Sequence, residues 1–256
     1  MPALRSVPDA PRRAGVRADD AVLRPVRQGN AFEETIERVL QVIKLGVVGV
    51  GERLPSERDL SLRLHVSRVT LREAIRTLQD AGYVESRRGR YGGTFVRAVP
   101  PTAHNGHRAG AVPAATKPTA ESLDDMLTFR HVVETGAAEH AAARALTDAE
   151  VDHLQRLLDL TTAAEPTQYR RCDSRLHLAV AELSGSTSVT AAVADARMAL
   201  NTQLDAIPLL THNIRHSDRQ HRRIVDAILS GQPVVARAAM EEHLAGTAAL
   251  LRAFLQ

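Results

Sequence analysis

The stretch LPSERDLSLRLHVSRVTLREAIRTLQDAG, residues 54–82, decides the fold of the N-terminal part of this chain. It holds two short helical patterns separated by a tight turn at residues 65–66. Ser56 precedes the first pattern and Ser67 the second, and a serine at such a position caps a helix by accepting a free N–H group of the first turn. Gly82 follows the second pattern, where a glycine ends a helix in the left-handed conformation. The stretch therefore predicts two short helices joined by a turn.

Apolar and basic side chains take different faces of the second helix, which we expect to run to about Ala81. The apolar positions recur at helical spacing and should pack inward; they are Leu71, Ala74, Ile75 and Leu78. Three arginines, Arg68, Arg72 and Arg76, follow one another at intervals of four on a separate stripe. A further amphipathic helix is predicted from about Ala31 to Val48.

Two short strand patterns, residues 83–87 and 94–97, flank the turn Arg-Gly-Arg-Tyr-Gly-Gly at 88–93. Two helices, a tight turn and a basic hairpin together predict a winged helix-turn-helix over residues 30–98. From residue 53 to residue 97 we count ten arginines against five acidic residues. The first turn of the second helix can enter the major groove of DNA, and the hairpin can follow the flanking minor groove.

The sequence patterns outside residues 30–98, taken with that domain, predict a mostly α protein. Residues 1–29 read as a disordered N-terminal arm and residues 99–119, with four prolines, as a linker. Residues 120–256 predict an all-α antiparallel bundle of about six helices, which would bind an effector and dimerise. Its expected helix boundaries are capping boxes at Thr147/Glu150 and Ser217/Gln220, a start at Pro166, an end or kink at Pro208, and a stop at Gly231–Pro233.

The composition and the apolar runs of the chain indicate its cellular location. The chain has 256 residues, a formal net charge of +3 and one cysteine, Cys172, so no intrachain disulfide can form. The sequence has neither the apolar core of a signal peptide nor a run long enough to span a bilayer. We therefore expect a cytoplasmic protein with no membrane partner.

Four residues of the C-terminal half predict a metal site. Asp173 and His177 lie four residues apart on one helix face, and His221 and His243 each lie on or beside an apolar stripe. Three imidazoles and a carboxylate are costly to bury alone, and one divalent ion (Zn, Ni, Mn or Fe) would bind all four. The alternative is that each histidine is separately hydrogen-bonded, and spacing alone favours this for any single one.

The N-terminal motifs resemble the GntR-type regulators. The segments that carry the resemblance are 54–60, 66–74, 82–84 and 88–96, in the order and spacing of that family. The resemblance implies that Arg58, Arg68, Thr70 and Arg72 contact DNA and that Gly93 lies at the wing tip.

The C-terminal half is similar to the helical (FCD-type) domain of the FadR-like branch of that family, through Asp-x-x-x-His at 173–177 and the segments 220–228 and 240–244. Many members hold a divalent metal with one Asp and three His, which implies that role for Asp173, His177, His221 and His243. The resemblance also implies that Arg130 binds the carboxylate of an effector. A salt bridge to Glu134, four residues on, is the alternative.

The resulting hypothesis is a homodimeric repressor, not an enzyme. Its partners would be double-stranded operator DNA and a small organic-acid or sugar-acid effector bound at the metal. Two alternatives stay open: a metal-dependent enzyme with a DNA-binding appendage, and a metal that only stiffens the bundle.

Overall fold

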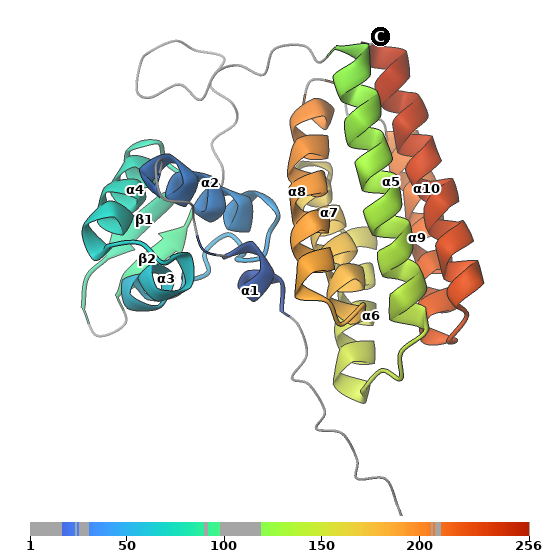
Figure 1. The fold of residues 1–256 in the computed structure, drawn as a ribbon, viewed down its shortest axis with the longest axis horizontal. Helices are drawn as coiled ribbons and strands as arrows, with labels where there is room; N and C mark the ends of the chain where they lie inside the picture. Colours follow the sequence, from blue (N-terminus) through green and yellow to red (C-terminus); the bar gives the residue numbers. More distant parts are fainter. Residues whose placement is uncertain are drawn as a thin grey trace, which may run out of the picture.

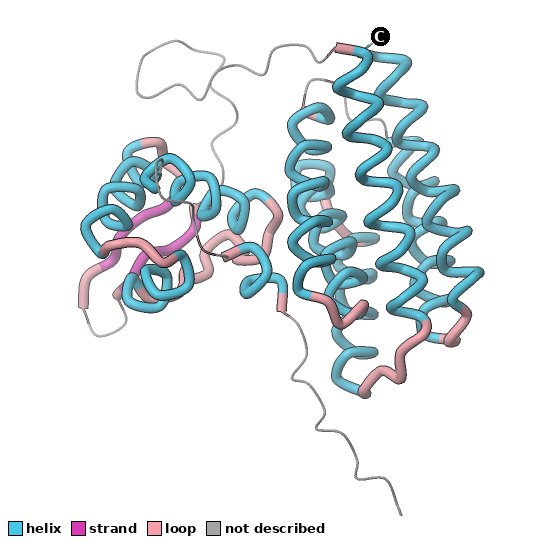
Figure 2. Tube along the Cα trace, in the orientation of Figure 1, coloured by secondary structure: helices cyan, strands magenta, loops and turns pink. Residues whose placement is uncertain are grey.

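A computed structural model describes residues 17–23, 25, 31–89, 92–97, 119–205, 207 and 211–255. Two bodies are visible in Figure 1, a small N-terminal body with a two-stranded sheet and a larger bundle of long helices. Figure 2 shows the same division between a mixed α/β part and an all-helical part. The predicted combination of a winged helix-turn-helix and an all-α bundle is confirmed.

The N-terminal body contains α2 (Ala31–Lys44), α3 (Glu57–Leu64) and α4 (Arg68–Asp80), followed by β1 (Val84–Arg87) and β2 (Gly93–Val96). The first helix was expected to reach about Val48, but it ends at Lys44 because Gly46 adopts a positive φ of 70°. Both serine caps form: Ser56 accepts from the N–H of Asp59, and Ser67 from that of Thr70. Leucine side chains from all three helices fill one shared core.

The strands β1 and β2 form an antiparallel hairpin in which Val84 lies opposite Val96 and Arg87 opposite Gly93. The chain before α3 widens this small sheet. The N–H of Leu54 donates to the carbonyl of Thr94 over 2.9 Å, and a bridge joins Arg53 to Phe95. Since a two-stranded hairpin alone is only marginally stable in water, these extra bonds fix the wing to the helices.

Six helices build the C-terminal body among the residues that the structure describes. They are α5 (Ala120–Ala142), α6 (Asp148–Thr162), α7 (Pro166–Leu183), α8 (Thr187–Leu204), α9 (Thr211–Leu229) and α10 (Pro233–Leu255). The long helices α5 and α10 lie side by side along the front of the bundle in Figure 1. A second buried core, of Leu, Ile, Val and Ala, holds α5, α6, α7, α9 and α10 together.

Most of the predicted boundaries hold. Thr147 and Glu150 form the reciprocal capping box of α6, Pro166 opens α7, and Gly231 separates α9 from α10 with a φ of 63°. The capping box at Ser217 is wrong, because Ser217 lies inside the continuous helix α9. Pro208 lies outside the described residues.

The prediction of a disordered arm over residues 1–29 is wrong for the residues that form a helix. Residues Ala18–Val22 form the short helix α1, which lies between the two bodies in Figure 1. Ala18, Ala21 and Val22 are each 1% exposed and pack mainly on α8. A five-residue helix is too short to be stable alone, so tertiary packing gives it its structure.

None of the described helices is both long and apolar enough to cross a membrane.

Candidate functional site

The N-terminal end of α4 carries the predicted DNA-contacting residues. The turn before it uses His65 in the left-handed conformation, φ 53°, and the Ser67 cap then starts the helix. Arg68 and Arg72 are exposed, and Thr70 is half-buried with its hydroxyl 2.9 Å from that of Ser67. The arginines therefore face solvent at the helix end where free N–H groups favour an anion.

The helix α3 adds charge beside this end. Arg58 is exposed on α3. Arg72 Nε donates to Oε2 of Glu57 over 2.8 Å, which joins α4 to the first turn of α3. Exposed pairs of this kind contribute at most about 1 kcal/mol, so Arg72 can exchange Glu57 for a phosphate at little cost.

The wing is held close to the body by Gly93. This glycine has a φ of 148°, and a Cβ added to it would lie 2.5 Å from Nε of Arg53. On the same hairpin the Arg87 guanidinium stacks over the Phe95 ring, 4.3 Å from its centre. Gly93 starts β2 opposite Arg87, and the tip residues 90–91 lie outside the described residues.

The bundle brings the four predicted metal ligands together. Asp173 and His177 come from α7, His221 from α9 and His243 from α10. One possible ligand atom from each lies within 4.8 Å of the others, and the four residues are between 2% and 9% exposed. As expected, all four side chains point into the interior of the bundle.

The atoms that converge are the Nε2 atoms and one carboxylate oxygen. Nε2 of His221 lies 3.1 Å from Oδ1 of Asp173 and 3.3 Å from Nε2 of His243. Nε2 of His177 lies 3.7 Å from the same Oδ1 and has no hydrogen-bond partner among the described residues. A buried nitrogen left without a partner is costly, and a cation at this point would remove the cost.

The opposite ring nitrogens of two of the three histidines are held by other side chains, whereas Nδ1 of His221 has no hydrogen-bond partner among the described residues. Nδ1 of His177 is hydrogen-bonded to Glu134, and Nδ1 of His243 lies 3.2 Å from Oε1 of Gln220. When an acceptor takes the Nδ1–H, the lone pair is on Nε2 and points at the cluster. Metal-binding histidines are held by such outer partners as a rule.

A buried arginine fixes the carboxylate. Nη2 of Arg197, on α8, donates to Oδ2 of Asp173 and also lies 3.2 Å from Oγ of Ser174. Arg197 is 1% exposed. Since it takes Oδ2, the other oxygen, Oδ1, is left facing the three imidazoles.

Arg130, which the resemblance predicted to bind an effector, forms the salt bridge to Glu134 that was the alternative. Its Nε donates to Oε1 of Glu134 over 2.7 Å, and both side chains are 1% exposed. Its Nη1 and Nη2 have no partner within the described part of the chain. Burial raises the pKa of Glu134, but Arg130 and His177 outweigh it and hold this pKa below its usual value.

The protonation states suit a metal ion. Burial opposes the charge of Asp173, but the Arg197 guanidinium holds the pKa of this carboxyl well below its usual value. Burial lowers the pKa of His177, although Glu134 acts in the opposite direction. Burial and then the neighbouring imidazoles hold the pKa of His243 well below its usual value. An ionised carboxylate and neutral imidazoles are the forms that bind metals.

The sequence analysis missed Arg197 and the role of Glu134 as a partner of His177. A signal for Arg197 was present: it lies on the face of α8 whose other members, Val193, Ala194 and Leu200, are buried and apolar. An arginine is rarely fully buried without a partner, so its position on that face indicated a buried anion nearby.

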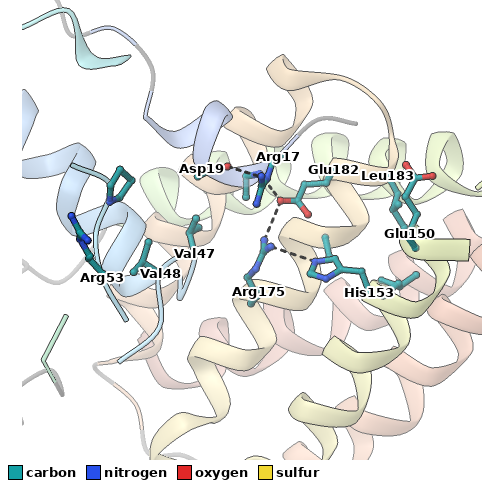
Figure 3. A pocket seen from close by; sticks show the side chains of 15 residues that line it. Arg17, Asp19, Val47, Val48, Arg53, Glu150, His153, Arg175, Glu182 and Leu183 are labelled. Carbon is teal, nitrogen blue, oxygen red and sulfur yellow. Dashed lines mark hydrogen bonds and ion pairs between the residues drawn. The ribbon is translucent and has the colours of Figure 1, made fainter. Parts of the chain in front are cut away.

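A cavity of about 530 Å³ lies between the two bodies. Arg175 lines this cavity, and Figure 3 shows its contacts with Glu182 and His153. Arg175 Nη1 donates to Glu182 over 3.2 Å, and Glu182 also accepts the N–H of Ala18 in α1. Asp19, the next residue of α1, forms an ion pair of 3.1 Å with Arg63 of α3. The short helix α1 thus contacts both bodies.

The two bodies correspond to two known families. Residues 32–96 match the bacterial regulatory proteins of the gntR family, and residues 125–246 match the FCD domain. The solved structure of Escherichia coli McbR/YncC has the same fold, with a TM-score of 0.53 at 16% identity; the match covers 88% of this chain and 98% of that one.

Relatives of similar length give the same result. The chain is 30% identical over 226 residues to an E. coli K12 protein whose name assigns it to the regulation of the L-lactate dehydrogenase operon, with 83% of each chain covered. It is 29% identical over 256 residues to the HTH-type transcriptional repressor NanR of Cronobacter sakazakii, covering 91% of this chain and 90% of NanR. Both relatives are named as transcription regulators. This chain is likewise a regulator rather than an enzyme. It belongs to the GntR family of DNA-binding transcription regulators, with a GntR-type winged helix-turn-helix followed by an FCD domain.

Proposed function

We propose that the chain is a homodimeric repressor that leaves its operator when a small carboxylate binds at a metal ion in the FCD domain. The observation that carries this proposal is the convergence of three buried Nε2 atoms on Oδ1 of Asp173. A cluster of this composition fits a divalent ion, with Zn, Ni, Mn and Fe as the candidates.

In the DNA-binding domain, Arg58, Arg68, Thr70, Arg72 and Gly93 would form the operator contacts. Their support is the exposure of the three arginines at the free end of α4 and on α3, and the close approach of the wing to Arg53 at Gly93. The local excess of arginine supplies the attraction to phosphate that all duplex binders need.

In the FCD domain, Asp173, His177, His221 and His243 would hold the metal. A bound divalent ion supplies a Lewis acid whose remaining coordination positions can take a carboxylate. Glu134 keeps His177 in the tautomer that offers Nε2, and Arg197 keeps Oδ1 of Asp173 directed at the cluster.

Arg130 would bind the effector carboxylate through the two nitrogens that have no partner in the described structure. Its ion pair with Glu134 uses only Nε, so the planar end of the guanidinium is left for a bidentate contact. The relatives' names, one referring to an L-lactate dehydrogenase operon and one to a repressor, support a small organic acid or sugar acid and a repressor role.

Control of DNA binding requires that the effector favour one arrangement of the two DNA-binding domains of a dimer. The two bodies of one chain meet at a polar contact that such a change can alter. Gln41 of α2 donates to Asp195 of α8 over 2.9 Å, and Arg38 of α2 reaches the same oxygen over 3.3 Å. A protein that binds chromosomal DNA would work in the cytoplasm.

Thermal-shift screening of small carboxylates, L-lactate included, with and without divalent metals tests the proposal, because a ligand of the native state raises the melting temperature. We expect a carboxylate whose stabilisation needs the metal. Stabilisation that survives complete metal removal would instead indicate a metal that only stiffens the bundle.

A further inference from the structure

One apolar side chain on the DNA-binding face has no role in packing. Val69 is the second residue of α4, after the cap Ser67, and it is 67% exposed. The residues of α4 that fill the core lie on another face; they are Leu71, Ala74, Ile75 and Leu78. Val69 is therefore not needed to fold the domain.

Its surroundings on α4 are polar. Within α4, all of which the structure describes, the other exposed side chains can form hydrogen bonds; they are Arg68, Arg72, Glu73, Arg76, Thr77, Gln79 and Asp80. A single exposed valine on a protein surface is ordinary. Here its position matters, because it lies between Arg68 and Thr70 in the turn that enters a major groove.

The first turn also holds this side chain in one direction. Oγ of Ser67 accepts the N–H of Thr70 over 3.0 Å and lies 2.9 Å from the Thr70 hydroxyl. A valine in a helix has one strongly preferred rotamer, and its Cβ leans toward the N-terminal end of the helix. Val69 thus presents its methyl groups at the end of α4 that would face the bases.

In the major groove, the apolar group on the edge of a base pair is the C5-methyl of thymine. We propose that Val69 contacts this methyl group and so specifies a thymine in each operator half-site. The inference rests on the proposed operator contacts of α4, and it adds a base-reading residue that cannot form hydrogen bonds.

Uracil substitution tests it, since uracil differs from thymine only by the missing methyl. The operator is first selected from fragments of the protein's own chromosome. Each thymine of a half-site is then replaced by uracil, and the affinity of the full-length protein is measured by fluorescence anisotropy at fixed salt. Burying one methyl group corresponds to about a fourfold change in affinity, so we expect about a fourfold loss at one thymine per half-site.

Val69→Ala carries the second half of the test. We expect it to bind the thymine operator about fourfold more weakly and to show no further loss with uracil at that position. Leu160→Ala is the matched control, because Leu160 is 60% exposed but lies on α6 of the bundle; it should keep the full uracil effect. Circular dichroism of both variants checks the fold.

The inference is overturned if no uracil substitution weakens the wild type, if the selected half-site has no thymine, or if Val69→Ala keeps the full loss. Absence of sequence-specific binding by the wild type would instead refute the proposed function. Unchanged uracil sensitivity in Val69→Ala, with operator binding lost in Arg72→Ala, would refute this inference alone.

Discussion

Replacing Arg197 by alanine removes the partner of a buried carboxylate. Arg197 is 1% exposed and donates to Oδ2 of Asp173, which is itself 9% exposed. Breaking a buried ion pair from one side costs about 3–5 kcal/mol, because the remaining buried charge loses its cationic partner. For a chain of this size each kcal/mol lowers the melting temperature by about 2–4 °C, so we expect metal-free Arg197→Ala to melt about 6–20 °C below the wild type.

A bound metal ion should reduce this loss of melting temperature. A divalent ion beside Oδ1 would supply positive charge to the same carboxylate. The difference in melting temperature between Arg197→Ala and the wild type should therefore be smaller when both proteins hold metal than when both are metal-free. Differential scanning fluorimetry of the wild type and Arg197→Ala, each with and without a chelator, measures all four melting temperatures. Arg223→Ala is the control: Arg223 pairs with Glu242 at the surface over 2.8 Å, and such exposed pairs contribute at most about 1 kcal/mol.

Two results would refute this reasoning. If metal-free Arg197→Ala melted at the wild-type temperature, the ion pair with Asp173 would not stabilise the bundle. If the loss were equal with and without metal, the ion would not lie beside Asp173.

Further predictions address the two proposed sites and the N-terminal cap of α4. Arg72→Ala should weaken operator binding about 5- to 150-fold, the range for loss of one arginine contact to DNA, with dimerisation unchanged; equal affinity in a gel-shift titration would exclude the contact. His221→Ala combined with His243→Ala should abolish metal binding, whereas His153→Ala should retain it; equal metal content by elemental analysis would place the metal elsewhere. Ser67→Ala should destabilise the DNA-binding domain by about 0.5–2 kcal/mol through loss of the N-cap, and an unchanged urea midpoint would contradict that.

The sequence predicted those parts of the fold that depend on neighbouring residues. Ser67 and its helix, the capping box at Thr147 and the break at Gly231 are all local signals, and each produces the expected boundary. The same kind of signal was misleading at Ser217, because a helix that continues through a capping motif satisfies those N–H groups itself. The helix α1 had no local signal, since its stability comes from packing on α8.

The four residues of the proposed metal site were predictable from the sequence, but the side chains that hold them in place were not. Helical spacing placed Asp173 and His177 on one face of α7 and directed His221 and His243 toward the interior, and the family resemblance then implied the same four residues. The contact between Arg197 and Asp173, and that between Glu134 and His177, join residues far apart in sequence. Such contacts depend on how three or more helices pack, which periodicity within one helix does not specify.

The most direct test of the account is the affinity of the full-length protein for its operator, measured by fluorescence anisotropy while a small carboxylate that raises the melting temperature is titrated. We predict that the carboxylate weakens operator binding by the metal-loaded wild type, and that it has no effect on the chelated protein or on the His221→Ala/His243→Ala variant. An equal response in all three proteins, or no response in the metal-loaded wild type, would contradict control of DNA binding through this cluster.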